Sequence, residues 1–233
     1  MDQQRILLAH GNGGKLQQDL LEKVVFPLWQ DVVMPSTRDS QILSWEPNSL
    51  AISTDSYVVN PLFFPGGNIG HLAICGTTND LAMSGAQPLY LTVSFILEEG
   101  FALEDFKKIV ASMGDQARTL GVRIAAGDLK VVDKGKGDGI YINTAGLGRT
   151  MKEPVPGPDR LRPGAKVLVS GDLARHGLVI MMSREGMEFS SDLVSDCAPL
   201  WPSVRALQEM NVDILCLRDL TRGGLATALH ELA

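Results

Sequence analysis

The sequence predicts a mixed protein of helices and strands, built as two domains that a proline-rich linker separates. Strand-like and helix-like patterns alternate along residues 50–147. Four prolines then follow within a short stretch, at positions 154, 156, 158 and 163, and neither a helix nor a central strand tolerates that density. At 233 residues, 45% of them hydrophobic, the chain is long enough to bury a core without disulfides or metals. We expect domains at residues 1–149 and 165–233, joined by a linker at residues 150–164.

Five elements are predicted in the first domain. Residues 50–59 show a two-residue period with many β-branched side chains, which is typical of a strand. Residues 67–85 are rich in Ala, Gly, Ser and Thr, and they predict a tightly packed helix. Residues 103–120 carry apolar side chains at three- and four-residue steps before Gly121, which predicts an amphipathic helix with a glycine stop. Residues 89–97 and 139–147 are further strands.

The second domain is expected to contain strands at residues 166–170 and 213–217 and helices at 204–210 and from Arg222 onward. The helical pattern continues to Ala233 without a cap, a glycine or a proline. We therefore expect the chain to stop partway through this domain.

Composition and charge exclude several classes of protein. The formal net charge is −6 and no basic tract is present, which argues against a nucleic-acid-binding protein. The longest apolar runs are strand-length, so we expect no membrane span, and the N-terminus lacks a signal-peptide layout. Cys75, Cys197 and Cys216 are odd in number and widely spaced, which is typical of reduced thiols in a cytoplasmic protein. His71 and Cys75 stand four residues apart and could ligate a metal; without visible further ligands, a packed helix face is the favoured interpretation.

Four acidic residues share a context that suits magnesium bound to a polyphosphate. They are expected at strand ends or beside small residues: Asp55 in STDSYVV, Asp80 in TTNDLAM, Asp128 in AAGDLKVV and Asp219 in LRDLTRGG. Magnesium prefers oxygen ligands and usually takes a few carboxylates together with phosphate oxygens. Each residue alone is also explained as a helix cap or a turn former. Because the context recurs four times, we favour a shared site.

A glycine-rich loop near the N-terminus is a further candidate. It comprises Gly11, Asn12, Gly13, Gly14 and Lys15. Successive backbone N–H groups in such a loop can cradle an anion. The spacing is not that of a P-loop, and Leu16 stands where a P-loop has Ser or Thr.

These segments, in this order, resemble the HypE family of hydrogenase maturation proteins, which are carbamoyl dehydratases. The resemblance runs from His10 to the end and rests on AHGNGGK, on residues 53–100 from STDSYVVNPLFFPGGNIGHLAICG to FILEEG, and on GDLKVVDKG, LVSDCAPL and RDLTRGGLATALHE. Aminoimidazole ribonucleotide synthetase, selenophosphate synthetase and thiamine-monophosphate kinase share the same fold. Another ATP-dependent synthetase or kinase of this kind is therefore one alternative, and a non-catalytic docking protein for maturation partners is another.

The resemblance implies an α+β first domain of the aminoimidazole ribonucleotide synthetase type, whose sheet forms a homodimer, and an incomplete α/β second domain. It implies ATP and Mg²⁺ as cofactors, with Asp55, Asp80, Asp128 and Asp219 around the metal and phosphates. Asn79 and the loop Gly11–Lys15 would line the nucleotide. Lys130 would lie near the reacting carbamoyl group.

The resemblance also implies partners. HypF carbamoylates a cysteine at the family's extreme C-terminus, ATP converts the thiocarbamate into a thiocyanate, and a HypC–HypD complex receives the cyanide. This chain ends at Ala233 without that cysteine. We therefore expect this chain to contain the nucleotide-binding part of the enzyme and to be inactive in dehydration by itself.

Overall fold

The computed structural model describes residues 15–20, 22–23, 41–45, 48–185 and 192–233. The chain divides into two compact units, one of residues 38–219 and one that combines residues 1–37 with residues 220–233. The smaller unit contains helices α1 (Lys15–Leu20) and α7 (Gly224–Leu232). The helix expected from Arg222 onward is thus present and begins two residues later.

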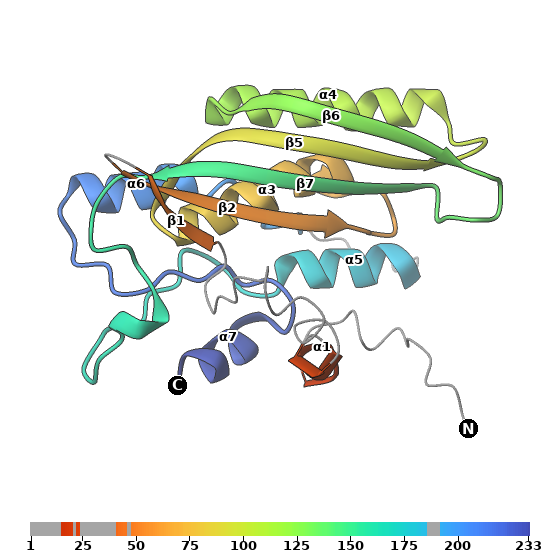
Figure 1. The fold of residues 1–233 in the computed structure, drawn as a ribbon. Coiled ribbons are helices and arrows are strands. Elements are labelled where there is room, and N and C mark those ends of the chain that lie inside the picture. Colours follow the sequence, from red (N-terminus) through yellow and green to blue (C-terminus); the bar gives the residue numbers. More distant parts are fainter. Residues whose placement is uncertain (1–14, 21, 24–40, 46–47, 186–191) are drawn as a thin grey trace. The chain divides into compact units, whose positions relative to one another are not determined.

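The larger unit is built on a five-stranded sheet in the order β1-β2-β7-β5-β6 (Figure 1). Its strands are β1 (Gln41–Trp45), β2 (Asn48–Tyr57), β5 (Ala86–Glu98), β6 (Arg123–Val132) and β7 (Ile140–Thr150). Only the β5–β6 pair is parallel, because α4 (Leu103–Leu120) connects these two strands, whereas the other pairs are antiparallel. The short strands β3 (Phe63–Phe64) and β4 (Gly67–Asn68) form a separate hairpin that leads into α3 (Ile69–Met83).

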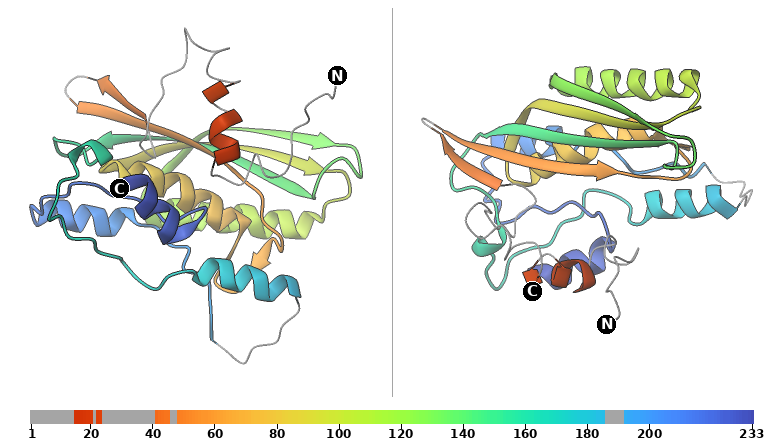
Figure 2. Two further views of the ribbon diagram at one scale, coloured as in Figure 1. Left: turned by 90° about the horizontal axis from the view of Figure 1, so that it is seen from below. Right: turned by 45° about the vertical axis from the view of Figure 1, so that its right-hand side comes forward.

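Helices cover one face of the sheet. Figures 1 and 2 show α3, α4 and α6 (Trp201–Glu209) on the same side of the strands. The main core lies between these layers and includes Ile69, Ile74, Leu91, Val93, Ile109, Met113 and Ile142. Two further helical segments belong to this unit, the 3₁₀ turn Pro158–Arg160 and α5 (Arg175–Glu185). No described helix has the length and apolar character that a membrane span requires.

The local signals explain the helices well. Asn68 caps α3, because its Oδ1 accepts bonds from the backbone N–H groups of Gly70 (2.8 Å) and His71 (3.1 Å). Gly121 ends α4 in a left-handed conformation with φ of 68°. Residues 103–120 form α4 as the apolar period predicts.

The small residues of α3 allow close packing. A Cβ on Gly70 would lie 2.5 Å from the carbonyl oxygen of Ile109 on α4. A Cβ on Gly76 would overlap the hydroxyl of Tyr57 on β2 and lie 2.9 Å from a carbon of its ring. Glycine at these two positions therefore sets how near α3 comes to its neighbours.

Two predicted strands are absent from the described structure. Residues 166–170 and 213–217 are irregular. The first segment leaves its apolar side chains exposed, with Leu168 at 87%, because no described strand pairs with it. The second uses its carbonyls elsewhere: Leu215 accepts from the backbone N–H of Gly157 (2.9 Å), and Ile214 accepts from the guanidinium of Arg160 (2.6 Å).

We expect Gly76→Ala to lower the free energy of unfolding by about 1–3 kcal/mol, because the added methyl displaces Tyr57 from the core. Gly114→Ala is the matched control, since it lies inside α4 and its Cβ would meet only the flexible tip of Arg118 at 3.4 Å. This control should raise the free energy of unfolding by about 0.5–1 kcal/mol. Urea unfolding followed by circular dichroism measures both, and equal effects would contradict the packing argument.

Candidate functional site

The candidate site begins on β2, whose alternate residues face the helix layer. Ser53 and Tyr57 are buried and Asp55 is half-buried, while Thr54 and Ser56 between them are exposed. Asp55 stands opposite Thr144 of β7, which is completely buried under α3. The period of two therefore delivers a hydroxyl, a carboxylate and a phenol to one face of the strand.

The opposite wall comes from α3, where Thr77 and Asp80 lie about one helical turn apart. The hydroxyl of Ser53 donates to Oδ2 of Asp80 at 2.5 Å. Thr77 shares a bond with Tyr57 at 3.0 Å and another with Thr144 at 2.5 Å. We call Ser53, Asp55, Tyr57, Thr77 and Asp80 the β2/α3 cluster.

Tyr57 orients the first carboxylate of the cluster. Its hydroxyl donates to Oδ2 of Asp55 at 3.0 Å. Burial raises the pKa of Tyr57 far above its ordinary value, and the negative charge of Asp55 raises it further. The phenol thus stays protonated and remains a donor at every physiological pH.

The cluster suits a hard cation. Asp55 and Asp80 are half-buried, so both stay within reach of an ion, and each has one oxygen oriented by a neighbouring hydroxyl. The side chains that bond to the two carboxylates in the cluster are hydroxyls, and oxygen is the ligand type that Mg²⁺ prefers. The residues therefore fit a magnesium ion held by carboxylates and phosphate oxygens.

Asp128 and Lys130 do not join this cluster within one chain. Both lie in the interior of β6, and Lys130 Nζ donates to the two oxygens of Asp128 at 2.9 Å each. This bond lowers the pKa of the exposed Asp128 carboxyl. Asp128 pairs in register with Ser94, the neighbour of the buried Val93, so it faces the open side of the sheet, away from the helices.

Asn79 performs a packing role that the sequence did not suggest. Its Nδ2 donates to the carbonyl of Ala198 at 3.0 Å, and its Oδ1 accepts from the backbone N–H of Leu200 at 2.8 Å. Both ends of the amide thus fasten residues 198–200 to α3.

The remaining predicted site residues are less informative. Asp219 is buried at the end of the larger unit. Lys15 is the exposed first residue of α1 in the smaller unit, and Gly11, Asn12, Gly13 and Gly14 lie outside the described residues. The expectation of carboxylates at strand ends is wrong in detail, because Asp55 and Asp128 lie within their strands and Asp219 follows no strand.

Sequence reasoning missed the hydroxyl side chains of Ser53, Tyr57 and Thr77. The signal for two of them was present, since Ser53 and Tyr57 occupy the same alternate positions of β2 as Asp55. Thr77 could not be identified, because only packing shows which turn of α3 meets β2.

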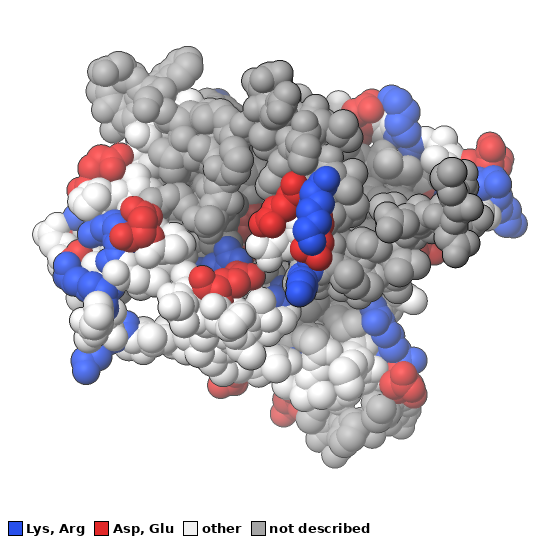
Figure 3. Space-filling model, turned by 60° about the horizontal axis from the view of Figure 1, so that its bottom comes forward, with Lys and Arg blue, Asp and Glu red and all other residues white. Residues whose placement is uncertain are grey.

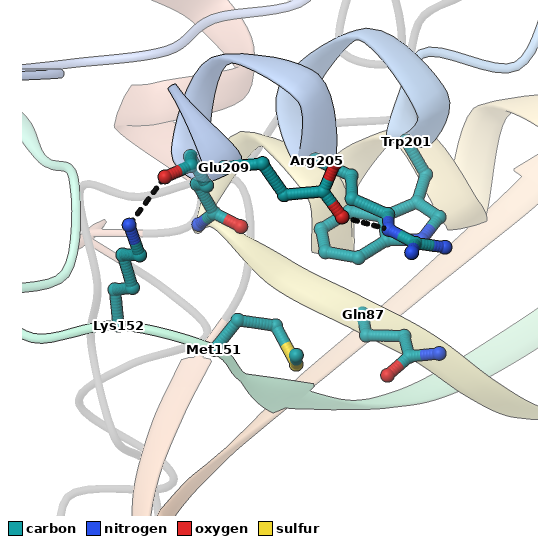
Figure 4. A pocket seen from close by; sticks show the side chains of 7 residues that line it. Gln87, Met151, Lys152, Trp201, Arg205 and Glu209 are labelled. Atoms are coloured by element: carbon teal, nitrogen blue, oxygen red, sulfur yellow. Dashed lines mark hydrogen bonds and ion pairs between the residues drawn. The ribbon is translucent and has the colours of Figure 1, made fainter. Parts of the chain in front are cut away.

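A small pocket of about 280 Å³ lies elsewhere, where α6 meets the first residues of β5 and the end of β7 (Figure 4). Figure 4 shows Trp201, Arg205 and Glu209 on α6 across from Gln87 and Met151. Its charged groups bind within the protein: Arg205 pairs with Glu209 at 2.7 Å, and Lys152 donates to Asn211 at 2.6 Å. No predicted site residue lines it.

Charges of both signs lie on the face of the molecule that Figure 3 shows. On the face that Figure 3 shows, acidic and basic side chains of the described residues intermingle without a large patch of one sign.

Two family models match the chain. AIR synthase related protein, N-terminal domain, matches residues 37–150, and AIR synthase related protein, C-terminal domain, matches residues 162–233. The α+β fold class expected from the sequence is thereby confirmed.

Curated relatives carry the name carbamoyl dehydratase HypE. The protein of Rhizobium leguminosarum bv. viciae is 45% identical over 230 residues, which are 98% of this chain and 66% of the relative. The protein of Escherichia coli (strain K12) is 45% identical over 233 residues, with 98% and 69% covered. The chain thus spans about two thirds of the length of the curated relatives it matches.

Solved structures give the same picture. A HypE–HypF complex matches with a TM-score of 0.85 and 45% identity, covering 91% of this chain and 69% of the other. HypE in complex with ATP matches with a TM-score of 0.78 and 45% identity, covering 98% and 68%. A thiamine monophosphate kinase from Aquifex aeolicus, at 18% identity, a TM-score of 0.62 and coverage of 84% and 66%, shows the shared fold alone.

We expect Asn79→Ala to lower the free energy of unfolding by about 1–3 kcal/mol, since it leaves the Ala198 carbonyl and the Leu200 N–H without partners. Hydrogen exchange at the Leu200 amide should accelerate. Asn143→Ala is the control, because that exposed amide bonds only to Asp55 O and Ser56 Oγ among the described groups, and it should cost much less. Unchanged exchange at Leu200 in Asn79→Ala would refute the fastening role.

Proposed function

Since this chain belongs to the HypE family of hydrogenase maturation proteins, we propose that it serves the ATP-dependent dehydration of a cysteine S-carboxamide to a thiocyanate, the source of an iron-bound cyanide. The observation that carries the proposal is the β2/α3 cluster, in which two half-buried carboxylates are each oriented by a hydroxyl. A synthetase or kinase acting on another small substrate is not favoured, because the kinase likeness is confined to the fold.

The chemistry requires a site that manages phosphate charge. An amide oxygen is a poor leaving group, whereas the same oxygen departs readily as phosphate once the γ-phosphoryl group of ATP is attached to it. Loss of that phosphate and of the two amide protons leaves a carbon–nitrogen triple bond. Catalysis of this kind depends on positioning and on neutralising negative charge.

We assign Asp55 and Asp80 to hold the magnesium that neutralises the triphosphate. Tyr57 and Ser53 fix the orientation of these carboxylates, so the site need not reorganise when the nucleotide binds. Gly11, Asn12, Gly13, Gly14 and Lys15 are proposed to line the nucleotide, together with Asn79 through its hold on residues 198–200. Asp219 is proposed as a further acidic residue of the cleft.

Asp128 and Lys130 enter the proposal through a second copy of the chain. Lys130 supplies the cation for the carbamoyl oxygen, and Asp128 contributes charge to the metal. Because both face the open side of the sheet, whereas the β2/α3 cluster faces the helices, we propose that they act at the interface with a partner protomer rather than at the cluster of their own chain.

The open face of the sheet is the proposed dimer interface. Ile52, Tyr90 and Ile96 project from it and are 42–43% exposed, while the described helices of this unit cover the other face. Exposed apolar sheet faces mark interfaces. The HypE–HypF complex that this chain resembles supports HypF as the carbamoyl donor. HypC–HypD as acceptor and a cytoplasmic location complete the proposal and rest on membership of the family.

Asp80→Asn and Asp55→Asn should each weaken Mg-ATP binding about tenfold or more, because each removes one charge at nearly constant shape. Isothermal titration calorimetry with Mg-ATP measures this. Asp115→Asn is the control, since Asp115 is an exposed residue of α4 paired with Arg118, and its affinity should equal that of the unmodified chain. Equal affinity for Mg-ATP in the unmodified chain and in all three variants would contradict the assignment of Asp55 and Asp80 to the metal.

Ile96→Arg should convert the dimer into a monomer, because a charge placed in an apolar interface stays unpaired. Light scattering at micromolar concentration gives the mass. Val110→Arg is the matched control: Val110 is 41% exposed on α4, in the layer opposite the proposed interface, and its variant should remain dimeric. A monomeric unmodified chain, or loss of the dimer in both variants, would rule out the open face.

A further inference from the structure

Two thiols and an imidazole lie close together at the N-terminal half of α3. Within the described residues, His71, Cys75 and Cys197 form a group whose donor atoms all lie within 4.8 Å of one another. Cys75 is fully buried, and the other two are half-buried. The three residues are distinct from the β2/α3 cluster, and the reaction proposed above does not use them.

The helix positions two of the ligands by its period. His71 and Cys75 stand four residues apart, so their side chains lie on the same face of α3. The backbone of Gly66 and Gly67 lies beside the His71 ring and limits how it can turn.

The third ligand is held by contacts outside α3. The Cys197 backbone N–H donates to Oγ of Ser195 at 3.1 Å, and the Ser195 N–H donates to the carbonyl of Pro65 at 2.8 Å. On the other side of Cys197, Asn79 fastens residues 198–200 to α3. Cys197 is therefore fixed from both sides, with its thiol against Cys75.

Burial and the contact between the two thiols shift the pKa of each of the three groups. Burial lowers the pKa of His71, so its imidazole is neutral at pH 7. The hydrogen bond between the two thiols raises the pKa of Cys75, which is also buried, and lowers that of Cys197.

We propose that His71, Cys75 and Cys197 bind one Zn²⁺ ion, which ties residues 195–200 to α3. Two thiolates and an imidazole are the ligand types of zinc. Ligand atoms in a tetrahedral zinc site lie about 3.5–3.8 Å apart, so donor atoms that now lie within 4.8 Å need to approach one another by about 1.3 Å at most. The fourth position is left to water or to an external ligand.

Binding exchanges protons for the metal. The Cys75 and Cys197 thiols each lose a proton as the two sulfur–zinc bonds form, and the neutral imidazole loses none. The affinity for zinc therefore rises with pH. Because the ion binds only the folded protein, it also raises the melting temperature.

The test uses the 233-residue chain, purified under reducing conditions and freed of metal by dialysis against a chelator. Titration with Zn²⁺ against a competing chelator should give one ion per chain. Titration with Co²⁺ should give the visible bands of a tetrahedral site and thiolate-to-cobalt charge transfer in the near ultraviolet. X-ray absorption of the zinc form should show two sulfur ligands at about 2.3 Å and a nitrogen at about 2.0 Å.

Variants identify the ligands. Cys197→Ser and Cys75→Ser should weaken zinc binding at least tenfold and abolish the charge-transfer band, and His71→Gln should weaken binding while retaining the band. Cys216→Ser is the matched control, because its thiol contacts the carbonyl of Leu217 and lies outside the group. It should bind zinc like the unmodified chain.

Three results would overturn the proposal. They are an unmodified chain that binds no zinc, a Cys216→Ser variant that loses zinc as completely as Cys197→Ser, and mass spectrometry showing a Cys75–Cys197 disulfide in the reduced preparation. Because X-ray absorption is measured on the unmodified chain, the ligand assignment stays testable even where a serine variant misfolds. Mg-ATP binding is measured separately, so failure of one proposal leaves the other standing.

Discussion

The close packing of helix α3 against strands β2 and β7 is the constraint on which the rest of this structure depends. Buried hydroxyls of Tyr57, Thr77 and Thr144 bond to one another across the layers, since polar groups inside a core need partners. That contact is possible only because Gly76 has no side chain to separate helix and strand. The same contact sets Asp55 and Asp80 on facing elements, each oriented by a hydroxyl.

One helix thereby organises two chemically different sites. Toward β2, α3 presents oxygen ligands, which suit magnesium and phosphate. Toward residues 195–200 it presents sulfur and nitrogen, which suit a softer ion. Asn79 lies next to Asp80 in the sequence but faces residues 198–200, whereas Asp80 faces β2. A single turn of α3 therefore contributes to both sites. The segregation by ligand hardness keeps the two proposed metals from competing for the same groups.

The predictable parts of the fold are those with strong local signals. The period of residues 103–120 and the stop at Gly121 predicted α4, and the alternation in residues 50–59 predicted β2. Residues 166–170 and 213–217 have comparable apolar runs but form no strands, because a strand needs a partner, and local sequence does not supply one. Asp128 shows the same limit. Its residue type and neighbours suited a phosphate site, but the register of β6 turns it to the face opposite Asp55.

By itself the sequence determined the order of β2, α3, β5, α4 and β7, the family, and the four-residue spacing of His71 and Cys75. These depend on neighbours along the chain, where helix and strand periods act. Only the tertiary structure decided which face each carboxylate occupies and that Cys197 lies against Cys75, more than a hundred residues away. Packing between distant segments determines such contacts. A local sequence pattern does not specify the distance between two side chains that lie on different elements.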